Sequence, residues 1–492
     1  MDYIKINPAD NVAVALQDLS KGALVEGVTL SMDIPSGHKI VLRDLKAGDN
    51  VIKYGFPIGH VTRDAAAGTM VDHSCIKTNL EGLLEYSYQP ALVDIPEVPS
   101  KRTFNGFRRA DGQVGIRNQI WVIPTVGCVN GICQQIVERF KAEIAGTEGS
   151  VDAVVAFPHN YGCSQLGYDH ENTRTVLADM VHHPNAGGVL VVSLGCENNQ
   201  LDAFRGIVGP VDASRVRMFK TQEVKDEVEY GLQQLREIHA VCSKDVREEV
   251  PVSELRVGLK CGGSDGLSGI TANPLLGVFS DWIVAEGGTT VLTEVPEMFG
   301  AETILMNRCQ DEATFDKTVH LINDFKEYFM KQGMPVYENP SPGNKAGGIS
   351  TLEEKSLGCT QKCGKSIVRG VLKYGKRLSV KGLNLLSAPG NDLVASTALA
   401  AAGCQIVLFT TGRGTPFGTF VPTMKISTNT PLAENKPGWI DFNAGVLAQD
   451  EPMDSVAARF TDFVLAVASG EPVNSERSGY REIAIFKQGV TL

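Results

Sequence analysis

Short apolar runs alternate with longer helical stretches from Phe104 onward, and this alternation constrains the fold more than any other feature. The expected strands are Trp121–Pro124, Val151–Phe157, Val189–Leu194, Leu255–Leu259, Thr289–Leu292, Leu383–Leu386 and Gln405–Phe409. The expected helices are Asn130–Ile144, Glu171–Val181, Thr221–Ala240, Asn273–Ala285, Glu312–Lys331, Asp392–Ala402 and Ser455–Ala468. Several of them place apolar residues three and four positions apart. The pattern predicts α/β layers built on mostly parallel sheets.

The first 90 residues have a different sequence pattern, because a short Asp-x-x-x-Gly motif occurs four times. Its copies begin at Asp18, Asp33, Asp44 and Asp64. Each copy is typical of a polar turn whose glycine takes a special backbone angle before a short strand. The repeat therefore predicts a small, twisted all-β domain.

These sequence patterns divide the chain into segments. We expect an all-β domain over residues 1–90, a linker over 91–103, a first α/β domain over 104–245 and a second over 255–492. The linker has two prolines and no helical period. The charged stretch Ser243–Glu254 marks the boundary between the α/β domains.

Composition excludes several classes of protein. The chain has 46 Lys and Arg against 57 Asp and Glu, a net charge of −11, which disfavours nucleic acid and acidic lipid surfaces as partners. No apolar run is long enough to span a membrane, and Met1–Asp10 lacks the apolar core of a signal peptide. The 11 cysteines, an odd number, indicate reduced thiols and a cytoplasmic protein.

The unusual polar residues follow the predicted strands. These loop tips include Cys128, His159–Gln165, Cys196–Gln200, Lys260–Asp265, Thr293–Glu297, Gly390–Asp392 and Thr411–Thr415. Ligands of open α/β sheets bind beyond the carboxyl ends of strands, so the tips together predict a site. Any one tip alone is better explained by turn formation.

Some side chains in these loops suit particular chemistry. Arg413 lies between two glycines, and an exposed guanidinium fork there suits a carboxylate. Lys355 is a general base if it is desolvated and a surface ion pair if it is not. His38 and His73 could bind a metal as neutral imidazoles, although turn histidines are more often exposed. No Cys-x-x-Cys occurs, so a zinc ribbon is not predicted, whereas a cluster held by dispersed loop thiolates stays open.

Taken together, the motifs resemble the altronate/galactarate dehydratase family over essentially the whole chain. The motifs are Asn11–Leu16, Gly37–Lys39, Val51–Gly59, Gly112–Asn118, Pro124–Asn130, His183–Asn185, Leu194–Glu197, Glu353–Cys359 and Thr410–Gly418. The resemblance implies an N-terminal SAF (β-clip) domain, two α/β domains, and removal of water from a sugar acid with iron(II) or manganese(II). For altronate the product would be 2-dehydro-3-deoxy-D-gluconate. The chain departs from the family at Asp72–Cys75, where a His-x-His-Asn segment is common.

Residue roles follow as hypotheses. We expect Arg413 to clamp the carboxylate and Lys355 and His159 to be base and acid, in an order left open. Further substrate contacts are expected from Asn160, Gln361, Asn391, Asp392 and Thr411. The expected metal ligands are His38, His73, Cys196 and Glu197. Carboxylate and imidazole ligands favour Fe²⁺ or Mn²⁺, whereas thiolates would favour an iron–sulfur cluster.

Alternatives to this function remain at this stage. The nearest is a dehydratase of galactarate or another hexarate, followed by a lyase that expels sulfite from a sulfonated hydroxy acid. A non-catalytic sugar-acid sensor would need the site without metal dependence, but the sequence shows no DNA-binding helix pair. We expect a homo-oligomer, a dimer, in each enzymatic case.

Overall fold

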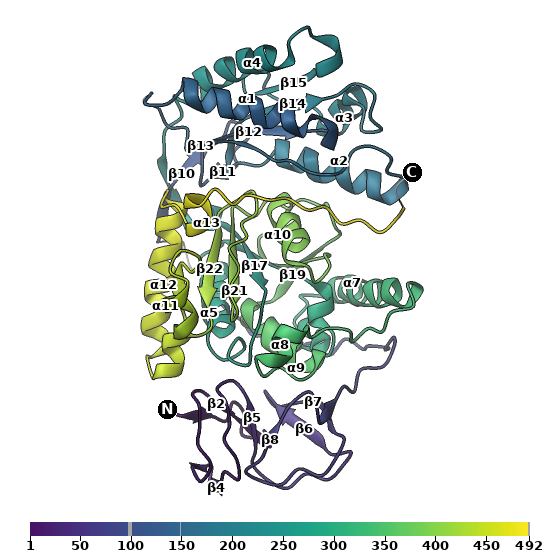
Figure 1. Ribbon diagram of the computed structural model, residues 1–492, viewed down its shortest axis with the longest axis vertical. Coiled ribbons are helices and arrows are strands. Elements are labelled where there is room, and N and C mark those ends of the chain that lie inside the picture. The colour runs from purple at the N-terminus through teal and green to yellow at the C-terminus, as the bar shows by residue number, and fades with distance from the viewer. Residues whose placement is uncertain (97–100, 148, 491–492) are drawn as a thin grey trace.

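The computed structural model describes residues 1–96, 101–147 and 149–490. Three layered units follow one another along its long axis (Figure 1). The N-terminal β unit lies at one end, and a four-stranded α/β unit lies at the other. A seven-stranded α/β unit built from the last part of the chain lies between them. The predicted multidomain α/β architecture with an N-terminal all-β unit is confirmed.

The N-terminal unit consists of short antiparallel strands. They are β1 Tyr3–Ile4, β2 Val12–Ala15, β3 Leu24–Val25, β4 Val28–Thr29, β5 Lys39–Val41, β6 Asn50–Lys53, β7 Phe56–Val61, β8 Met70–Val71 and β9 Ile76–Lys77. They form sheets in the orders β1-β2-β5-β8, β6-β7-β9 and β3-β4.

The Asp-x-x-x-Gly repeat closes reciprocal turns within this unit. The Asp18 carboxylate accepts from the Ser36 backbone N–H at 2.9 Å, and Asp33 accepts from that of Lys21 at 2.7 Å. Asp44 and Asp64 exchange the same bonds with each other's turns. The glycine of each copy has a φ between 79° and 94°, the left-handed region that the repeat predicted.

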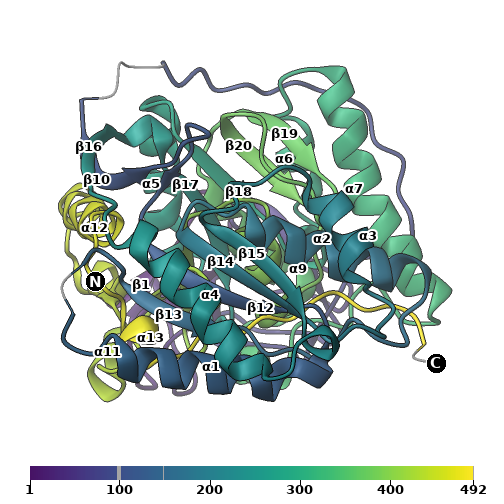
Figure 2. The same ribbon diagram turned by 90° about the horizontal axis from the view of Figure 1, so that it is seen from above.

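The four-stranded unit is a parallel sheet in the order β13-β12-β14-β15. Its strands are β12 Gln119–Pro124, β13 Ala153–Ala156, β14 Ala186–Ser193 and β15 Val216–Lys220. Helices α1 Asn130–Glu143 and α4 Glu227–Cys242 pack on its outer face, where Figure 2 shows them crossing the strands. Helices α2 Gly167–Val181 and α3 Leu201–Val208 pack on the inner face.

One expected helix in this unit begins later than predicted. Thr221–Glu223 forms a 3-10 turn, and α4 starts only after Asp226, whose carboxylate accepts from the Glu229 N–H at 3.0 Å. The capping carboxylate supplies a partner for an N–H that has none inside the helix. Strand β15 and helix α3 were not expected, because both are short and β15 mixes Arg and Lys with apolar residues at a sheet edge.

The seven-stranded unit is also fully parallel, in the order β19-β20-β18-β17-β21-β22-β23. Its strands are β17 Arg256–Cys261, β18 Thr289–Leu292, β19 Val368–Leu372, β20 Gly382–Leu386, β21 Ile406–Thr411, β22 Thr423–Ser427 and β23 Phe442–Asn443. Its helices are α5 Ala272–Ala285, α6 Glu302–Met306, α7 Glu312–Lys331, α8 Pro342–Ala346, α9 Leu352–Thr360, α10 Asp392–Ala401, α11 Thr430–Asn435, α12 Met453–Ala468 and α13 Asn474–Arg477. The 3-10 turns of the chain are η1 Gly127–Val129, η2 Thr221–Glu223, η3 Val252–Glu254, η4 Val295–Met298, η5 Gln361–Cys363 and η6 Gly445–Gln449.

Helix α10 connects the two α/β units. Its apolar side chains share one core with the inner face of the four-stranded sheet and with α2 and α3. Helices α5, α7 and α12 cover the other face of the seven-stranded sheet. The C-terminal segment returns to the four-stranded unit, where the backbone N–H groups of Gln488 and Gly489 donate to Asp169.

Segments that enter and leave the four-stranded unit form a small antiparallel sheet of β11 Val114–Gly115, β10 Thr103–Arg108 and β16 Glu248–Pro251. The expected linker ends in β10, and its residues 97–100 lie outside the described residues. Before it, Tyr86 donates to Glu302 at 2.6 Å, so this segment lies against the seven-stranded unit. Among the described residues, no helix is both long enough and apolar enough to span a membrane.

The backbones of the N-terminal unit and the seven-stranded unit are in direct contact where the two units join. A Cβ at Gly266 would lie 1.9 Å from the Gly37 carbonyl oxygen, and one at Gly348 would lie 2.4 Å from the same atom. Neither contact can be relieved by moving a flexible side chain. Glycine at both positions is therefore required for the two units to approach this closely.

We predict that Gly266→Ala lowers the free energy of unfolding by about 1–3 kcal/mol, because the added methyl group overpacks this junction. Gly206→Ala is the matched control, since nothing lies within 4 Å of a Cβ there and alanine favours the helix α3. Thermal denaturation followed by circular dichroism measures both variants. Equal stability of Gly266→Ala and the wild type would contradict the close approach.

Candidate functional site

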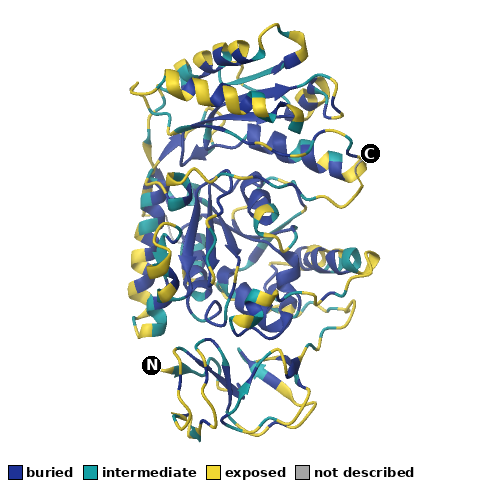
Figure 3. Ribbon diagram, in the orientation of Figure 1, coloured by how far each residue is buried: buried dark blue, intermediate teal, exposed yellow. Residues whose placement is uncertain are grey.

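Helix α9 lies between the N-terminal unit and the carboxyl edge of the seven-stranded sheet. All nine of its residues are buried (Figure 3), although three of them are charged. Thr351 caps its first turn by accepting from the Glu354 N–H. Because buried charges are costly unless they are paired, each charged side chain must find a partner outside the helix.

Glu354 binds two lysines of the N-terminal unit. Its carboxylate oxygens lie 2.9 Å from Lys39 Nζ and 2.8 Å from Lys53 Nζ, and all three side chains are buried. Although burial opposes ionisation, the two ammonium groups lower the pKa of Glu354 to about 2. Burial lowers the pKa of Lys39. Glu354 raises the pKa of Lys53, although burial opposes this shift. The two lysines differ because one carboxylate cannot compensate two ammonium groups equally. Glu353 beside it accepts from Thr78 Oγ1 and the Asn79 N–H.

Lys355 points the other way, towards the sheet. Its Nζ lies 2.7 Å from Glu297 Oε1 and donates to the side-chain oxygens of Asn339 and Asn344. Although burial works against it, Glu297 raises the pKa of Lys355 well above its usual range. The pKa of Glu297 is held low by Lys355, again against burial. The Lys355 side chain is therefore a charged ammonium group at neutral pH.

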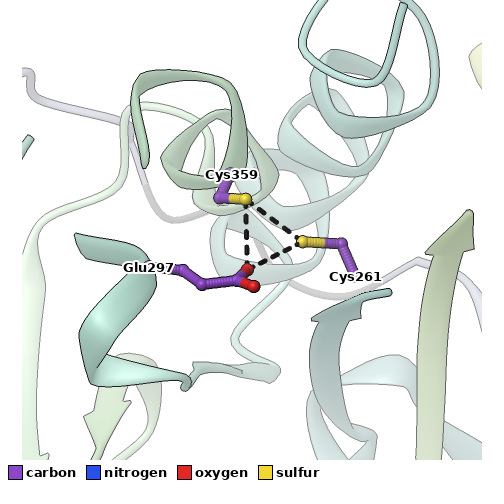
Figure 4. Close-up of side chains that lie close together, drawn as sticks. All are labelled: Cys261, Glu297 and Cys359. Atoms are coloured by element: carbon purple, nitrogen blue, oxygen red, sulfur yellow. Dashed lines mark hydrogen bonds between the residues drawn. The ribbon is translucent and has the colours of Figure 1, made fainter. Parts of the chain in front are cut away.

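Cys261, Glu297 and Cys359 form a compact group at the same place (Figure 4). The two sulfur atoms are 3.2 Å apart, and each lies 3.2 Å from Glu297 Oε2. Lys362 Nζ lies 2.7 Å from the Cys261 sulfur. The hydrogen bond from Cys359 lowers the pKa of Cys261 to about 6, and Lys362 acts in the same direction.

This group is the candidate metal centre. Two thiolates and a carboxylate suit iron(II) better than manganese(II), because manganese prefers oxygen ligands. Three protein ligands also leave a coordination position for another molecule. A cation would compete with Lys362 and Lys355 for the same lone pairs.

An open cleft of about 610 Å³ lies beside this buried group, between the N-terminal unit and the sheet edge. Arg413 and His38 line it from opposite units, together with Asp265 and Asn429. Its volume lies within the range of about 300–1,000 Å³ that is usual for small-molecule pockets. Asp265 also lines a small inner cavity with Lys355 and Cys359, so it borders both spaces.

Six sequence-predicted residues lie at this sheet edge: Lys355, Gln361, Asn391, Asp392, Thr411 and Arg413. Arg413 is exposed, whereas Thr411 is buried and accepts from the Gly414 N–H at 2.8 Å, which shapes the loop. Asn391 caps α10, and Gln361 donates to the Leu357 carbonyl oxygen. Asp392 pairs with buried Lys260 at 2.8 Å, which also pairs with Glu294 at 2.6 Å.

The four expected metal ligands do not form one site. Cys196 and Glu197 follow β14 in the four-stranded unit, whereas His38 and His73 belong to the N-terminal unit at the opposite end (Figure 1). Glu197 is buried and accepts from Thr125, Gly195 and Ser193, so it holds its own loop together. His73 is exposed and is not among the residues that line the cleft.

His159 and Asn160 also lie in the four-stranded unit, away from Lys355 and Arg413. The buried His159 ring donates from Nε2 to the Pro124 carbonyl oxygen and accepts at Nδ1 from the Tyr161 N–H. Burial lowers the pKa of His159 to about 4, so the ring is neutral. With both nitrogens engaged by the backbone, His159 is not positioned to exchange protons with Lys355's surroundings.

Sequence reasoning assigned no role to Cys261, Glu297, Cys359 or Lys362. Cys261 and Glu297 lay in the expected loop tips and Cys359 in the Glu353–Cys359 motif, but nothing local shows that they meet. Lys39 and Lys53 gave a signal that could have been used, since each is a lysine at the end of a short strand beside two β-branched apolar residues.

Comparison with known proteins shows the family to which the chain belongs. Family models match the chain in succession: the altronate/galactarate dehydratase SAF domain over residues 1–79, the D-galactarate dehydratase/altronate hydrolase second domain over 106–243, and the D-galactarate/altronate dehydratase C-terminal domain over 252–491. The chain belongs to the altronate/galactarate dehydratase family.

Individual members of this family match over full length. An altronate dehydratase of Bacillus subtilis is 58% identical over all of this chain and 99% of its own length. An altronate dehydratase of Escherichia coli is 57% identical and is covered completely. A galactarate dehydratase (L-threo-forming) of Escherichia coli is 34% identical over 98% of this chain and 96% of its own length.

We predict that Glu354 makes stability depend on pH. Its pKa is lower in the folded protein than the ordinary 4.5, so its contribution is present above pH 4.5 and is lost as the pH falls towards 2. The loss should amount to about 3 kcal/mol. Thermal denaturation at a series of pH values measures it.

Glu354→Gln should flatten this pH dependence and destabilise the protein by about 3–5 kcal/mol, because two buried ammonium groups lose their carboxylate. Glu327→Gln, at an exposed position on α7, is the control and should change little. Should Glu354→Gln not fold, Lys39→Met offers a milder variant, because it leaves one ammonium group for one carboxylate. An unchanged pH profile in Glu354→Gln would contradict the assignment.

Proposed function

We propose that this chain removes water from D-altronate to give 2-dehydro-3-deoxy-D-gluconate, in the cleft between the N-terminal unit and the seven-stranded sheet. The observation that carries the proposal is similarity of 57–58% over full length to two altronate dehydratases, against 34% to a galactarate dehydratase. A cleft lined by the exposed Arg413 guanidinium supports the location, since Asp265 borders both this cleft and the small cavity that Lys355 and Cys359 line.

The reaction needs three things from the protein. The proton on C2, beside the carboxylate, is weakly acidic and must be removed by a base. The hydroxyl on C3 must leave as water, which requires a proton donor. The negative charge that develops on the carboxylate must be stabilised. The resulting enol then becomes the 2-keto acid.

Arg413 is proposed to hold the substrate carboxylate, since its guanidinium is exposed in the cleft and carries the planar donor pair that a carboxylate accepts. Lys355 is proposed to protonate the leaving hydroxyl, because Glu297 keeps it charged. The sequence left open which residue is the acid and which the base, and this proposal makes Lys355 the acid.

His38 is proposed as the base in place of His159. Its Nδ1 lies 3.1 Å from the Ser36 carbonyl oxygen, which can only accept, so Nδ1 carries the hydrogen and Nε2 keeps its lone pair. His38 is half-buried in the cleft wall opposite Arg413. The next position across the β5–β8 ladder is Asp72, so the segment that departs from the family pattern adjoins this histidine.

Iron(II) held by Cys261, Glu297 and Cys359 would supply Lewis acidity towards the substrate's oxygen atoms. The donor set favours iron(II) over manganese(II) for the reason given above. The dimer expected from the family resemblance stays a prediction.

Formation of a keto acid from D-altronate tests the proposed function, with galactarate in parallel. Both are measured after chelation and then with iron(II) plus reductant or with manganese(II). Iron-dependent turnover of altronate is the expected result. Turnover of galactarate alone would reassign the substrate, and turnover of neither would refute the proposal.

Arg413→Ala should raise KM for altronate by about tenfold or more, because a charge-assisted contact to the carboxylate is lost. Arg413→Lys should recover part of the effect by restoring the charge without the fork. Arg459→Ala removes an exposed arginine of α12 that pairs with Glu451 and serves as the control. A change in KM and kcat below about threefold in Arg413→Ala would refute the clamp.

Metal binding at the buried group is tested without activity. Cobalt(II) bound by thiolates gives strong near-ultraviolet charge-transfer absorption, and we expect Cys261→Ser and Cys359→Ser to lose most of it. Cys404→Ala is the control, since Cys404 is buried in an apolar core elsewhere. Absorption that persists in both serine variants would place the metal at other residues.

A further inference from the structure

Three cysteines differ from all the others in the chain. Cys128, Cys163 and Cys196 are exposed, whereas the other eight of the 11 cysteines are buried. Each exposed cysteine lies in the loop that follows one strand of the four-stranded sheet: Cys128 follows β12, Cys163 follows β13 and Cys196 follows β14. These strands are neighbours in the order β13-β12-β14, so their carboxyl ends share one edge. None of the three thiols has a part in the proposed dehydration.

The loops that carry these cysteines are bonded to one another beside the sulfur atoms. The Gly127 N–H donates to the Tyr161 carbonyl oxygen at 3.0 Å, and the Asn199 N–H donates to that of Gly162 at 3.0 Å. The Ser164 N–H donates to the Asn198 side chain at 2.7 Å. All the residues that make these bonds are within three positions of one of the cysteines.

The loops also approach more closely than a side chain would permit. A Cβ at Gly162, with φ of 98°, would lie 2.1 Å from the Thr125 carbonyl oxygen. A Cβ at Gly127 would lie 2.7 Å from the His159 carbonyl oxygen. Glycine next to Cys128 and Cys163 therefore lets these two loops converge, and hydrogen bonds join the loop of Cys196 to them.

The electrostatics of this edge favour an anion. Helices α1, α2 and α3 begin two, four and five residues after Cys128, Cys163 and Cys196 respectively. Three helix N-termini thus lie at this edge, where their positive dipole ends favour negative charge. The neighbouring carboxylate, Glu197, is buried and accepts hydrogen bonds from its own loop.

The spacing of the sulfur atoms selects the kind of ligand. A single tetrahedral ion at about 2.3 Å from each sulfur needs sulfur atoms about 3.8 Å apart. Within the described ranges, the only group of three donor atoms closer than 4.8 Å to one another is Cys261, Glu297 and Cys359. Cys128, Cys163 and Cys196 are not such a group, so their three sulfur atoms do not all lie within 4.8 Å of one another and do not suit a single ion. A multi-iron cluster binds its thiolates on separate iron atoms and so accepts sulfur atoms that are farther apart.

We propose that Cys128, Cys163 and Cys196 bind a cubane iron–sulfur cluster. Each of the three thiols would lose its proton to the buffer and displace a water or reductant thiolate from one iron, so that three iron–sulfur bonds form with no change in the oxidation state of the cluster. Two ferrous ions, two ferric ions and four sulfides give the required [4Fe–4S] core of charge +2. The fourth iron keeps a position for water or another small oxygen ligand, since three protein thiolates are supplied.

The test uses the full-length chain, reconstituted without oxygen from ferrous and ferric iron and sulfide in the presence of a thiol reductant. Gel filtration removes unbound material, and bound iron and sulfide are then measured with the visible absorption and the electron paramagnetic resonance signal after reduction. We expect about four irons and four sulfides per chain. Cys128→Ser, Cys163→Ser and Cys196→Ser should each lower bound sulfide at least fivefold while the circular dichroism spectrum is unchanged.

Cys404→Ala and Cys261→Ser are the matched controls and should retain the cluster. No sulfide bound to the wild type, or full retention of sulfide in the three serine variants, would overturn the proposal. Loss of the cluster in Cys261→Ser alone would overturn it as well, because the cluster would then lie at the buried group. These readouts do not depend on altronate turnover, so failure of the cluster and failure of the dehydratase proposal are distinguishable.

Discussion

The pairing of Glu354 with Lys39 and Lys53 is the interaction on which the rest of the structure depends. It places three charges out of water at the junction of two structural units. A buried charge that loses its partner destabilises a protein by about 3–5 kcal/mol, whereas an exposed pair such as Lys46–Asp64 is screened by solvent and contributes little to stability. The N-terminal unit is therefore fixed to the sheet edge by a contact that admits little displacement.

The same helix carries the chemistry. Lys355 and Cys359 project from α9 towards Glu297 and Cys261 at the sheet edge, while Glu353 and Glu354 hold the N-terminal unit. Helix α9 consequently determines both how the N-terminal unit packs on the sheet edge and how the side chains of the proposed site are arranged. Pairing on both sides explains why the nine buried residues of α9 can include three charged ones, because a displaced helix would leave these charges unpaired.

The carboxyl edges of the two parallel sheets both carry polar loops, but one edge is covered and the other is exposed. In the seven-stranded unit the edge is covered by α9 and the N-terminal unit, so its Lys, Glu and Cys side chains are buried and neutralise one another. In the four-stranded unit no element covers the exposed thiols of Cys128, Cys163 and Cys196 among the described residues. Burial, rather than residue type, decides that one edge pairs its charges and the other presents free thiols.

The sequence by itself determined the longer helices, the central strands and the loop tips, since periodicity and turn chemistry are local: α7 has the expected bounds, and the four Asp-x-x-x-Gly turns close as expected. Shorter elements such as β15 and α3 were not expected. It also singled out Arg413 and Lys355, whose proposed roles stay predictions. Only the tertiary structure decided which tips share a site. Lys39 and Glu354 are 315 residues apart, and Cys261 and Cys359 are 98 apart. His159 lost its expected role because packing engaged both ring nitrogens. Such pairings depend on how the structural units pack against one another, which no local sequence pattern predicts.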